Sequence, residues 1–116
     1  MSGSENCVFC KIVRGEIPAR EEYRDEHVVA FHDQKPQAPV HVLVVPTRHA
    51  DHLSAFAGAV GEDELARLLS VAAGLGKRLG RDGFRVVINE GPDGGQTVHH
   101  LHLHVLAGRP MGWPPG

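Results

Sequence analysis

Hydrophobic and polar positions alternate most clearly in residues 98–106, which read VHHLHLHVL. With the two-residue period of a β-strand, this segment places His100, His102 and His104 on one face and mostly apolar side chains on the other. Such imidazoles lie about 6–7 Å apart, which is a poor filling for a core but suits a site that handles phosphate, protons or metal. The pattern therefore predicts a final strand that carries chemistry on its polar face.

Residues 61–79 follow a helical pattern instead, with leucines and alanines that recur every three or four positions. Acidic residues occupy the first turn and basic residues the last, as the helix dipole favours, and Gly80 suits the C-terminal cap. Gly74 and Gly76 weaken a helix interior and therefore indicate close packing against a sheet. Two shorter helical segments are predicted at residues 7–14 and 49–56.

Three further segments are rich in β-branched and aliphatic residues and predict strands at 27–33, 40–45 and 84–89. The second is apolar on both faces, so it should be central in the sheet. Prolines in residues 34–39 keep that segment out of a continuous ladder, and residues 91–95 suit a turn. The strands and one long helix predict an α+β domain with an antiparallel sheet.

A chain of 116 residues with 41% apolar residues is expected to form one domain, residues 1–116, whose modest core a partner chain would enlarge. Residues 1–6 are expected to be a flexible end, and residues 107–116 a tail rich in proline and glycine. The net charge of −2 gives no attraction to nucleic acid or anionic membranes, and no apolar run is long enough to span a bilayer. Because no export signal is recognisable, the expected location is the cytoplasm.

Both cysteines belong to one C-x-x-C motif, from Cys7 to Cys10. In a chain without a recognisable export signal, this spacing indicates metal binding or redox chemistry before a structural disulfide. The chain also has nine histidines, an unusual number for its length, so nitrogen ligands are plentiful.

The H-x-H-x-H pattern followed by two apolar residues resembles the histidine triad (HIT) family of nucleotide hydrolases and transferases. Nearly the whole chain is similar to its Hint branch, the purine nucleoside phosphoramidases, through residues 31–33, 37–41, 89–91 and 94–96 and the tail WPPG. The resemblance implies a HIT-like fold: an antiparallel sheet of about five strands, one long helix and a short N-terminal helix. It also implies a homodimer that hydrolyses the P–N bond of adenosine or guanosine 5′-phosphoramidates.

The resemblance assigns His102 as the nucleophile, which attacks phosphorus to form a nucleotidyl-histidine that water then hydrolyses. An imidazole suits this step because much of it is unprotonated near neutral pH. In relatives the carbonyl of the residue matching His100 fixes the tautomer, and His104 and His41 are placed to bond phosphate oxygens and, if protonated, to stabilise developing charge. Without the resemblance, metal binding would be the favoured interpretation of His102, with a solvated strand face as another.

The same resemblance implies a nucleotide site. Asp33 can accept hydrogen bonds from both ribose hydroxyls, and Thr97 keeps the hydroxyl of the serine that relatives often carry. Glycines before Thr97 would let backbone N–H groups approach a phosphate, although on pattern alone this segment is a plain hairpin turn. The apolar residues of the purine slot are equally suited to an ordinary core. The candidate nucleotide-binding residues are Val8, Phe9, Ile12, Phe31, Asp33, Leu43, Asn89, Gly95, Gln96, Thr97, Val98, His102 and His104.

The cysteine pair departs from the mammalian type of Hint sequence, whereas other members of the superfamily carry it with two histidines as a zinc site. The corresponding ligands here are Cys7, Cys10, His49 and His100. Cys₂His₂ is a closed tetrahedral set, so this zinc would be structural and would hold the N-terminal helix against the sheet. His52 and His99 are neighbouring alternatives as ligands, and a reduced, metal-free cysteine pair is the other interpretation.

The tail around Trp113 is expected to reach an active site, its own or that of a partner subunit, with a free end as the alternative. Gly112 stands where relatives commonly have histidine, which leaves the specificity for the amine open. Three other functions compete with the phosphoramidase: dinucleoside polyphosphate hydrolysis or nucleotidyl transfer, nucleotide-dependent regulation or partner binding, and a zinc-binding structural module.

Overall fold

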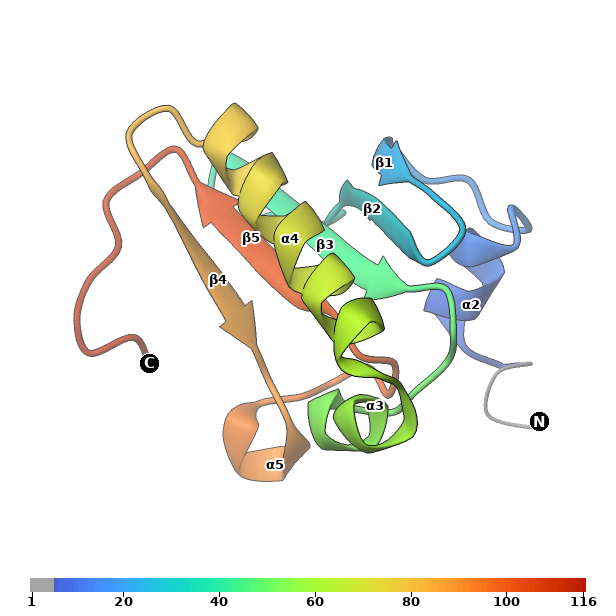
Figure 1. Ribbon diagram of the computed structural model, residues 1–116. Helices are drawn as coiled ribbons and strands as arrows, with labels where there is room; N and C mark the ends of the chain where they lie inside the picture. Colours follow the sequence, from blue (N-terminus) through green and yellow to red (C-terminus); the bar gives the residue numbers. More distant parts are fainter. Residues whose placement is uncertain (1–5) are drawn as a thin grey trace.

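The computed structural model describes residues 6–116, so the expected flexible end at 1–6 falls almost wholly outside the described residues. Its elements form one layered α+β unit, which confirms the predicted fold class (Figure 1). In chain order they are α2 (Val8–Val13), β1 (Glu21–Arg24), β2 (Val28–His32), β3 (Val40–Pro46), α3 (Leu53–Ala59), α4 (Glu62–Leu79), β4 (Phe84–Ile88), α5 (Gly91–Gly94) and β5 (Leu103–Ala107).

The five strands form one antiparallel sheet in the order β1-β2-β3-β5-β4. β3 lies in the centre, as its apolar sequence on both faces predicts. The long helix α4 crosses one face of the sheet, while α3 and α5 lie beyond the end where β4 finishes (Figure 1). The tail after β5 returns beside β4, where Arg85 donates to the carbonyl of Gly112.

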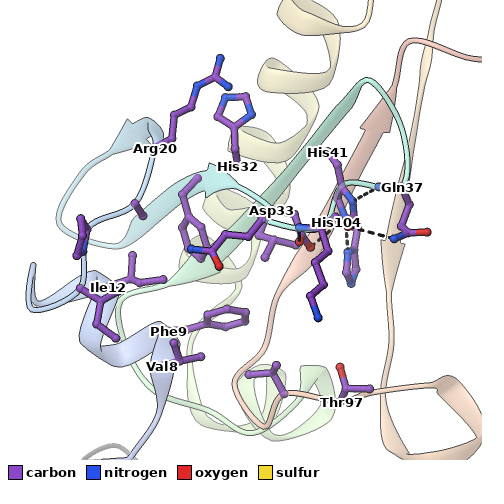
Figure 2. Close-up of a pocket in the computed structure, with 18 residues that line it drawn as sticks. Val8, Phe9, Ile12, Arg20, His32, Asp33, Gln37, His41, Thr97 and His104 are labelled. Atoms are coloured by element: carbon purple, nitrogen blue, oxygen red, sulfur yellow. Dashed lines mark hydrogen bonds and ion pairs between the residues drawn. The ribbon is translucent and has the colours of Figure 1, made fainter.

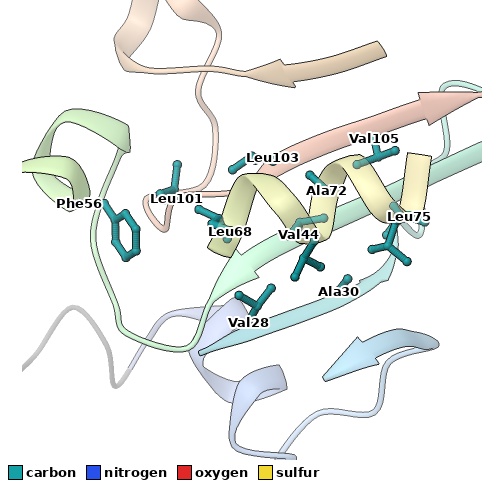
Figure 3. Close-up of a cluster of buried hydrophobic side chains, with 12 residues drawn as sticks. Val28, Ala30, Val44, Phe56, Leu68, Ala72, Leu75, Leu101, Leu103 and Val105 are labelled. Carbon is teal, nitrogen blue, oxygen red and sulfur yellow. The ribbon is translucent and has the colours of Figure 1, made fainter. Parts of the chain in front are cut away.

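Alternation along the strands divides the buried side chains between two cores. In β2, Val28 and Ala30 face α4, whereas Val29 and Phe31 face the opposite side of the sheet. The α4 core is filled by aliphatic side chains of α4, β3 and β5 and by Phe56 of α3 (Figure 3). The second core contains both cysteines and Phe9, so it brings α2 against the face of the sheet that carries the histidines.

The final strand is shorter than predicted, because β5 begins at Leu103 and residues 98–102 approach it as an irregular segment. Pairing with β3 stops at Leu103, and the N–H of Leu101 bonds the carbonyl of Ala50 instead of a strand neighbour. The predicted alternation nevertheless holds. Leu101 and Leu103 are buried in the α4 core, and His100 and His102 lie on the opposite side against Phe9.

Three other boundaries differ from the predictions. β1 was missed, because its residues EEYR, exposed or half-exposed at a sheet edge, show no hydrophobic alternation. α3 begins at Leu53 rather than at residue 49, because the His52 side chain caps it by accepting from the Ala55 N–H. The predicted turn at 91–95 is the single-turn helix α5.

The glycines of α4 have different surroundings. A Cβ on Gly76 would lie 2.3 Å from the ring of Phe84, so this position requires the close approach of α4 to β4 that the sequence suggested. Gly74 faces open space, and the same expectation is wrong there. Among the described residues, none of the helices has the length and apolar character needed to cross a membrane.

Candidate active site and metal centre

The His102 imidazole is held in one tautomer by the backbone. Its Nδ1 lies 2.7 Å from the carbonyl oxygen of His100, and a carbonyl only accepts hydrogen bonds, so Nδ1 carries the proton. In the neutral ring Nε2 then keeps its lone pair. The ring is 6% exposed and lies edge-on to Phe9 and His104, with centroid distances of 5.1 and 4.9 Å. This arrangement gives His102 one nucleophilic nitrogen of fixed identity.

A second pair of imidazoles forms a hydrogen-bonded chain with a defined direction. The backbone N–H of Gln37 donates to His41 Nδ1 at 3.0 Å, so the neutral His41 ring carries its proton on Nε2. That Nε2 donates to His104 Nδ1 at 2.9 Å and lies 3.5 Å from Asp33 Oδ2. His104 therefore keeps its own proton on Nε2, from which it can donate to a bound group.

Both rings of this chain are neutral near physiological pH. Burial lowers the pKa of His104 to about 4, and the neighbouring His102 and His41 act in the same direction. Burial also lowers the pKa of His41, against the opposing charge of Asp33. The role suggested for protonated imidazoles therefore does not apply near neutral pH, where these two rings act as hydrogen-bond donors.

An open cavity of about 1020 Å³ lies between α2, β2 and the start of β3 (Figure 2). Apolar side chains, among them Phe9 and Ile12 of α2, form one part of its wall, and Asp33, His41 and His104 lie together at another (Figure 2). A cavity with an apolar slot and a few convergent polar groups suits a nucleotide. Of the predicted nucleotide-binding residues, the wall contains Val8, Phe9, Ile12, Phe31, Asp33, Leu43, Thr97, Val98 and His104.

The other four predicted nucleotide-binding residues, Asn89, Gly95, Gln96 and His102, do not line this cavity. His102 lies just behind the wall, in ring contact with the wall residues Phe9 and His104. Gly95 follows α5 in the left-handed conformation with φ of 81°, which favours glycine. The Gln96 side chain is used within the protein, because its Oε1 accepts from the Gly91 N–H and its Nε2 donates to the carbonyls of Asp51 and Val98. Gln96 therefore shapes the turn instead of offering its amide to the cavity.

The four predicted metal ligands converge beneath α2. The Sγ and Nδ1 atoms of Cys7, Cys10, His49 and His100 all lie within 4.8 Å of one another. Cys7 Sγ is 3.2 Å from His100 Nδ1, and Cys10 Sγ is 3.2 Å from His49 Nδ1. A tetrahedral zinc ion with Zn–S of about 2.3 Å and Zn–N of about 2.0 Å separates sulfur and nitrogen by about 3.5 Å. The cluster fits zinc after a small expansion.

The Nε2 atoms of His49 and His100 make hydrogen bonds that also suit metal binding at Nδ1. His100 Nε2 donates to the carbonyl of Pro46 at 3.0 Å, and His49 Nε2 donates to Asp51 Oδ1 at 3.0 Å. Each ring therefore turns an unprotonated Nδ1 toward the sulfurs. Burial lowers the pKa of His100 to about 4, against the opposing effect of the Pro46 carbonyl, so the ring stays neutral and keeps its lone pair.

The surroundings of the cysteines determine their protonation. Burial, together with the neighbouring Cys7, raises the pKa of Cys10 to about 11. Without a cation Cys10 therefore stays a neutral thiol near neutral pH, and binding a metal as a thiolate requires it to release its proton. The alternative ligands do not join the cluster, since His52 caps α3 and His99 is exposed.

Sequence reasoning missed part of the cavity wall, because those residues come from the loops on either side of β1 and β2. The residues are Ile17, Pro18, Ala19, Arg20, Gln34, Lys35 and Gln37. His32, to which no chemistry was assigned, also lines the wall and pairs with Glu22 at 2.6 Å. The predicted contact of Trp113 with this chain's own site is absent, because Trp113 is 84% exposed and not part of the cavity wall.

Comparisons with known proteins agree with this geometry. The HIT domain family model matches residues 14–111. An uncharacterized HIT-like protein of Synechocystis is 51% identical over 97% of this chain and 99% of its own. A 14 kDa zinc-binding protein of Zea mays is 48% identical over 94% and 87%. The adenylylsulfatase HINT1 of Arabidopsis thaliana is 45% identical over 94% and 76%.

Solved structures resemble the whole chain as well. A HIT family hydrolase from Legionella pneumophila is 44% identical with a TM-score of 0.86, over 96% of this chain and 100% of that one. A zinc-bound histidine triad family protein from Mycobacterium smegmatis is 32% identical with a TM-score of 0.81, over 97% and 81%. The fold therefore has counterparts among solved structures, and one of these counterparts binds zinc.

Proposed function

Because this chain belongs to the HIT domain family, we propose that it is a nucleotide hydrolase of the Hint branch. Its substrate class is a purine nucleoside 5′-phosphoramidate, whose P–N bond it cleaves to release the nucleoside monophosphate and an amine. The observation that carries the proposal is the fixed tautomer of His102, whose Nδ1–H is held by the His100 carbonyl at 2.7 Å. An imidazole that presents only an Nε2 lone pair suits attack on phosphorus.

The reaction takes place in two displacements. His102 Nε2 donates its lone pair to the α-phosphorus, and the P–N bond breaks with its electron pair on the departing amine, which takes up a proton. Thr97 on the cavity wall is our candidate donor of that proton, directly or through water. Water then attacks the phosphorus and loses a proton, and the P–His102 bond breaks with its pair returning to Nε2. The bond from Nδ1–H to the carbonyl stabilises the positive imidazole between the two steps.

The chain from Gln37 through His41 to His104 supports the same step. It leaves the His104 Nε2–H free to donate to a non-bridging phosphate oxygen, on which charge grows during attack. Since His102 and His104 are 4.9 Å apart between ring centroids, one phosphate can contact both. The donation comes from a neutral ring, so it does not require an acidic pH.

The nucleoside occupies the cavity in this proposal. Phe31 and Leu43 of the central strands and Phe9 of α2 supply the apolar slot for the purine. Asp33 is half-buried at the end of β2 and accepts from the ribose hydroxyls. Thr97 lies on the cavity wall and can present its backbone N–H to the phosphate, whereas the Gly95 N–H donates to the carbonyl of Pro92 within the turn.

Zinc is the cofactor that this proposal assigns to the Cys7, Cys10, His49 and His100 cluster. The closed set of four ligands makes the ion structural, holding α2 to the sheet without an open position for substrate. We also propose a homodimer, supported by the position of β4 at a sheet edge with Phe84 41% exposed.

Adenosine 5′-phosphoramidate hydrolysis by the purified protein tests the assignment. His102→Ala is expected to abolish turnover while AMP still binds, because the nucleophile is lost and the cavity wall is kept. Phosphoramidase activity that survives in His102→Ala at the level of the parent protein would overturn the proposal. Zinc content near one ion per chain, by elemental analysis after purification without chelators, tests the cofactor.

A second candidate is hydrolysis of adenylyl sulfate, favoured by the printed name of the Arabidopsis relative. The same His102 attack applies with sulfate as the leaving group, and sulfate needs no proton to depart. Dinucleoside polyphosphate hydrolysis and a regulatory nucleotide-binding role remain the other candidates. Measuring kcat/KM for the phosphoramidate, adenylyl sulfate and a diadenosine polyphosphate side by side ranks these activities, and no turnover of any of them would favour the regulatory role.

A further inference from the structure

His100 belongs to two sites at once. Its side chain is fully buried, and its Nδ1 faces Cys7 Sγ at 3.2 Å and Cys10 Sγ at 3.5 Å. Its backbone carbonyl accepts from His102 Nδ1 at 2.7 Å. Any shift of the His100 backbone therefore moves the group that selects the tautomer of the nucleophile.

Phe9 forms a second connection, because it lies between the two cysteines on α2. Its ring meets His102 edge-on at a centroid distance of 5.1 Å and His100 at 5.9 Å. A displacement of Cys7 and Cys10 would therefore also displace the Phe9 ring relative to His102.

The segment that carries His49 forms a third connection. The carbonyl of Ala50 accepts from the Leu101 N–H at 2.8 Å, within the segment that leads to His102. The carbonyl of Asp51 accepts from Gln96 Nε2 at 2.5 Å, and Gln96 shapes the turn before Thr97. Three sets of contacts therefore connect the four ligands with His102 and the turn before Thr97: the His100 carbonyl, the Phe9 ring and the hydrogen bonds of the segment after His49.

We propose that metal binding at Cys7, Cys10, His49 and His100 positions the His102 imidazole and the turn at residues 95–97, so that the rate of nucleotidyl transfer follows metal occupancy. This inference rests on the proposed function and adds a positioning role to an otherwise structural cluster. Without metal, weak thiol contacts replace four metal–ligand bonds in a buried place. Displacements near 1 Å at a reacting group cost about 100-fold in rate.

The test varies metal occupancy without touching a ligand or a catalytic group. Asp51 is exposed and holds His49 only through Oδ1, so Asp51→Ala removes the acceptor behind that ligand. Loss of such a partner typically weakens metal binding about 10–100-fold. Asp82→Ala removes an exposed carboxylate from the turn after α4 and is the matched control.

Three quantities are measured on the same samples across a series of buffered free cobalt concentrations. They are the sulfur-to-cobalt absorption, which reports occupancy, the kcat for adenosine 5′-phosphoramidate, and the NMR signal of the His102 Nδ1 proton. Free metal is kept low, because Asp33, His41 and His104 also offer three ligand atoms within 4.8 Å of one another. Circular dichroism reports whether the chain stays folded.

We expect kcat and the Nδ1 proton signal to rise together with absorption, about 10–100-fold in kcat. In Asp51→Ala all three midpoints should move together to about 10–100-fold higher metal with the same plateau, and Asp82→Ala should superimpose on the parent. AMP affinity should change by a smaller factor than kcat, since strand pairing holds Phe31 against Leu43, and the Asp33 N–H bonds the His41 carbonyl, without any of the four ligands taking part. A kcat and a proton signal that ignore occupancy in the folded protein overturn the inference.

If the chain unfolds when the metal is removed, Phe9→Leu in the fully metal-loaded protein tests the positioning role instead. This variant keeps the ligands but removes the edge contact with His102, so the signal should broaden and kcat should fall at an unchanged cobalt midpoint. An unchanged signal and kcat in Phe9→Leu, combined with unfolding on metal loss, also overturn the inference. Absence of turnover in every loaded sample refutes the proposed phosphoramidase instead, while the NMR measurement still decides the positioning role.

Discussion

His41 offers the sharpest test of the hydrogen-bonded chain, because two substitutions separate its possible roles. His41→Leu fills a place that is 4% exposed with an apolar side chain of similar size, but removes the N–H from which His104 Nδ1 accepts. His41→Gln can return an N–H near the position of the His41 Nε2 proton without supplying an ionisable ring. A role in hydrogen bonding is therefore kept in one variant and lost in the other.

The size of the effect follows from the surroundings of His104. A buried acceptor without a partner costs about 1–3 kcal/mol, which corresponds to about 5–150-fold in rate. His104 is only partly buried, so water can replace the donor in part and the lower half of this range applies. Loss of the donor also frees His104 to move its proton to Nδ1. We expect His41→Leu to lower kcat/KM about 10-fold to 30-fold and His41→Gln to lower it less than about 5-fold.

Steady-state hydrolysis of adenosine 5′-phosphoramidate near pH 7 measures both variants, with urea unfolding and zinc content as checks that the fold persists. A leucine variant as active as the parent protein would show that the chain has no part in the reaction. A glutamine variant as impaired as the leucine variant would show that the ring itself is needed, as a proton carrier or through its shape. Either result refutes the assignment of His41 as a neutral donor.

Three further predictions concern stability and assembly. Although partial burial acts in the opposite direction, hydrogen bonds from Tyr23, Arg67 and two backbone N–H groups hold the pKa of Asp25 well below its usual range. The stability from that carboxylate is present above about pH 4 and is lost as the pH falls further, so Asp25→Asn should lower the urea midpoint at pH 7 more than at pH 3. Gly95→Ala forces a side chain into the left-handed region at φ of 81°, so urea unfolding should show a loss of about 1 kcal/mol and AMP should bind more weakly. Trp113 is the single tryptophan and is 84% exposed in one chain, so dimer formation over its surface should shift its emission to shorter wavelength as protein concentration rises, whereas unchanged emission in a sedimenting dimer would place the tail elsewhere.

Side-chain periodicity was enough to predict the layers of the fold. The alternation in residues 98–106 placed His100 and His102 opposite Leu101 even though most of that segment is not strand, because burial of leucines toward α4 decides the facing. The same criterion missed β1, which has Tyr23 among three charged residues and pairs through backbone groups at a sheet edge. Hydrophobic patterning therefore predicts the strands that contribute side chains to a core. It does not predict an edge strand that is held mainly by backbone hydrogen bonds.

Residue type predicted the members of the site better than their relations. The C-x-x-C motif and two histidines lie together at a spacing that fits zinc. No side-chain pattern indicates that the Gln37 N–H orients His41, because any residue except proline supplies that donor. Gln96 was expected to face phosphate, yet its amide is consumed by Asp51, Gly91 and Val98, which becomes visible only once the turn and the loop after β3 meet.

Backbone groups fix the tautomers of His102 and His41. The histidine pattern alone therefore does not define the site, because the fold must bring these backbone groups to the rings. The His100 carbonyl is aimed at His102 because Leu101 is buried on one side and the His100 ring on the other. The Gln37 N–H reaches His41 because the proline-rich loop returns the chain to the start of β3. Three histidines in another extended segment would titrate near their ordinary range and exchange tautomers freely. Burial keeps His41 and His104 neutral. The Gln37 N–H then decides which nitrogen of His41 carries the proton, and the His41 Nε2–H decides it for His104.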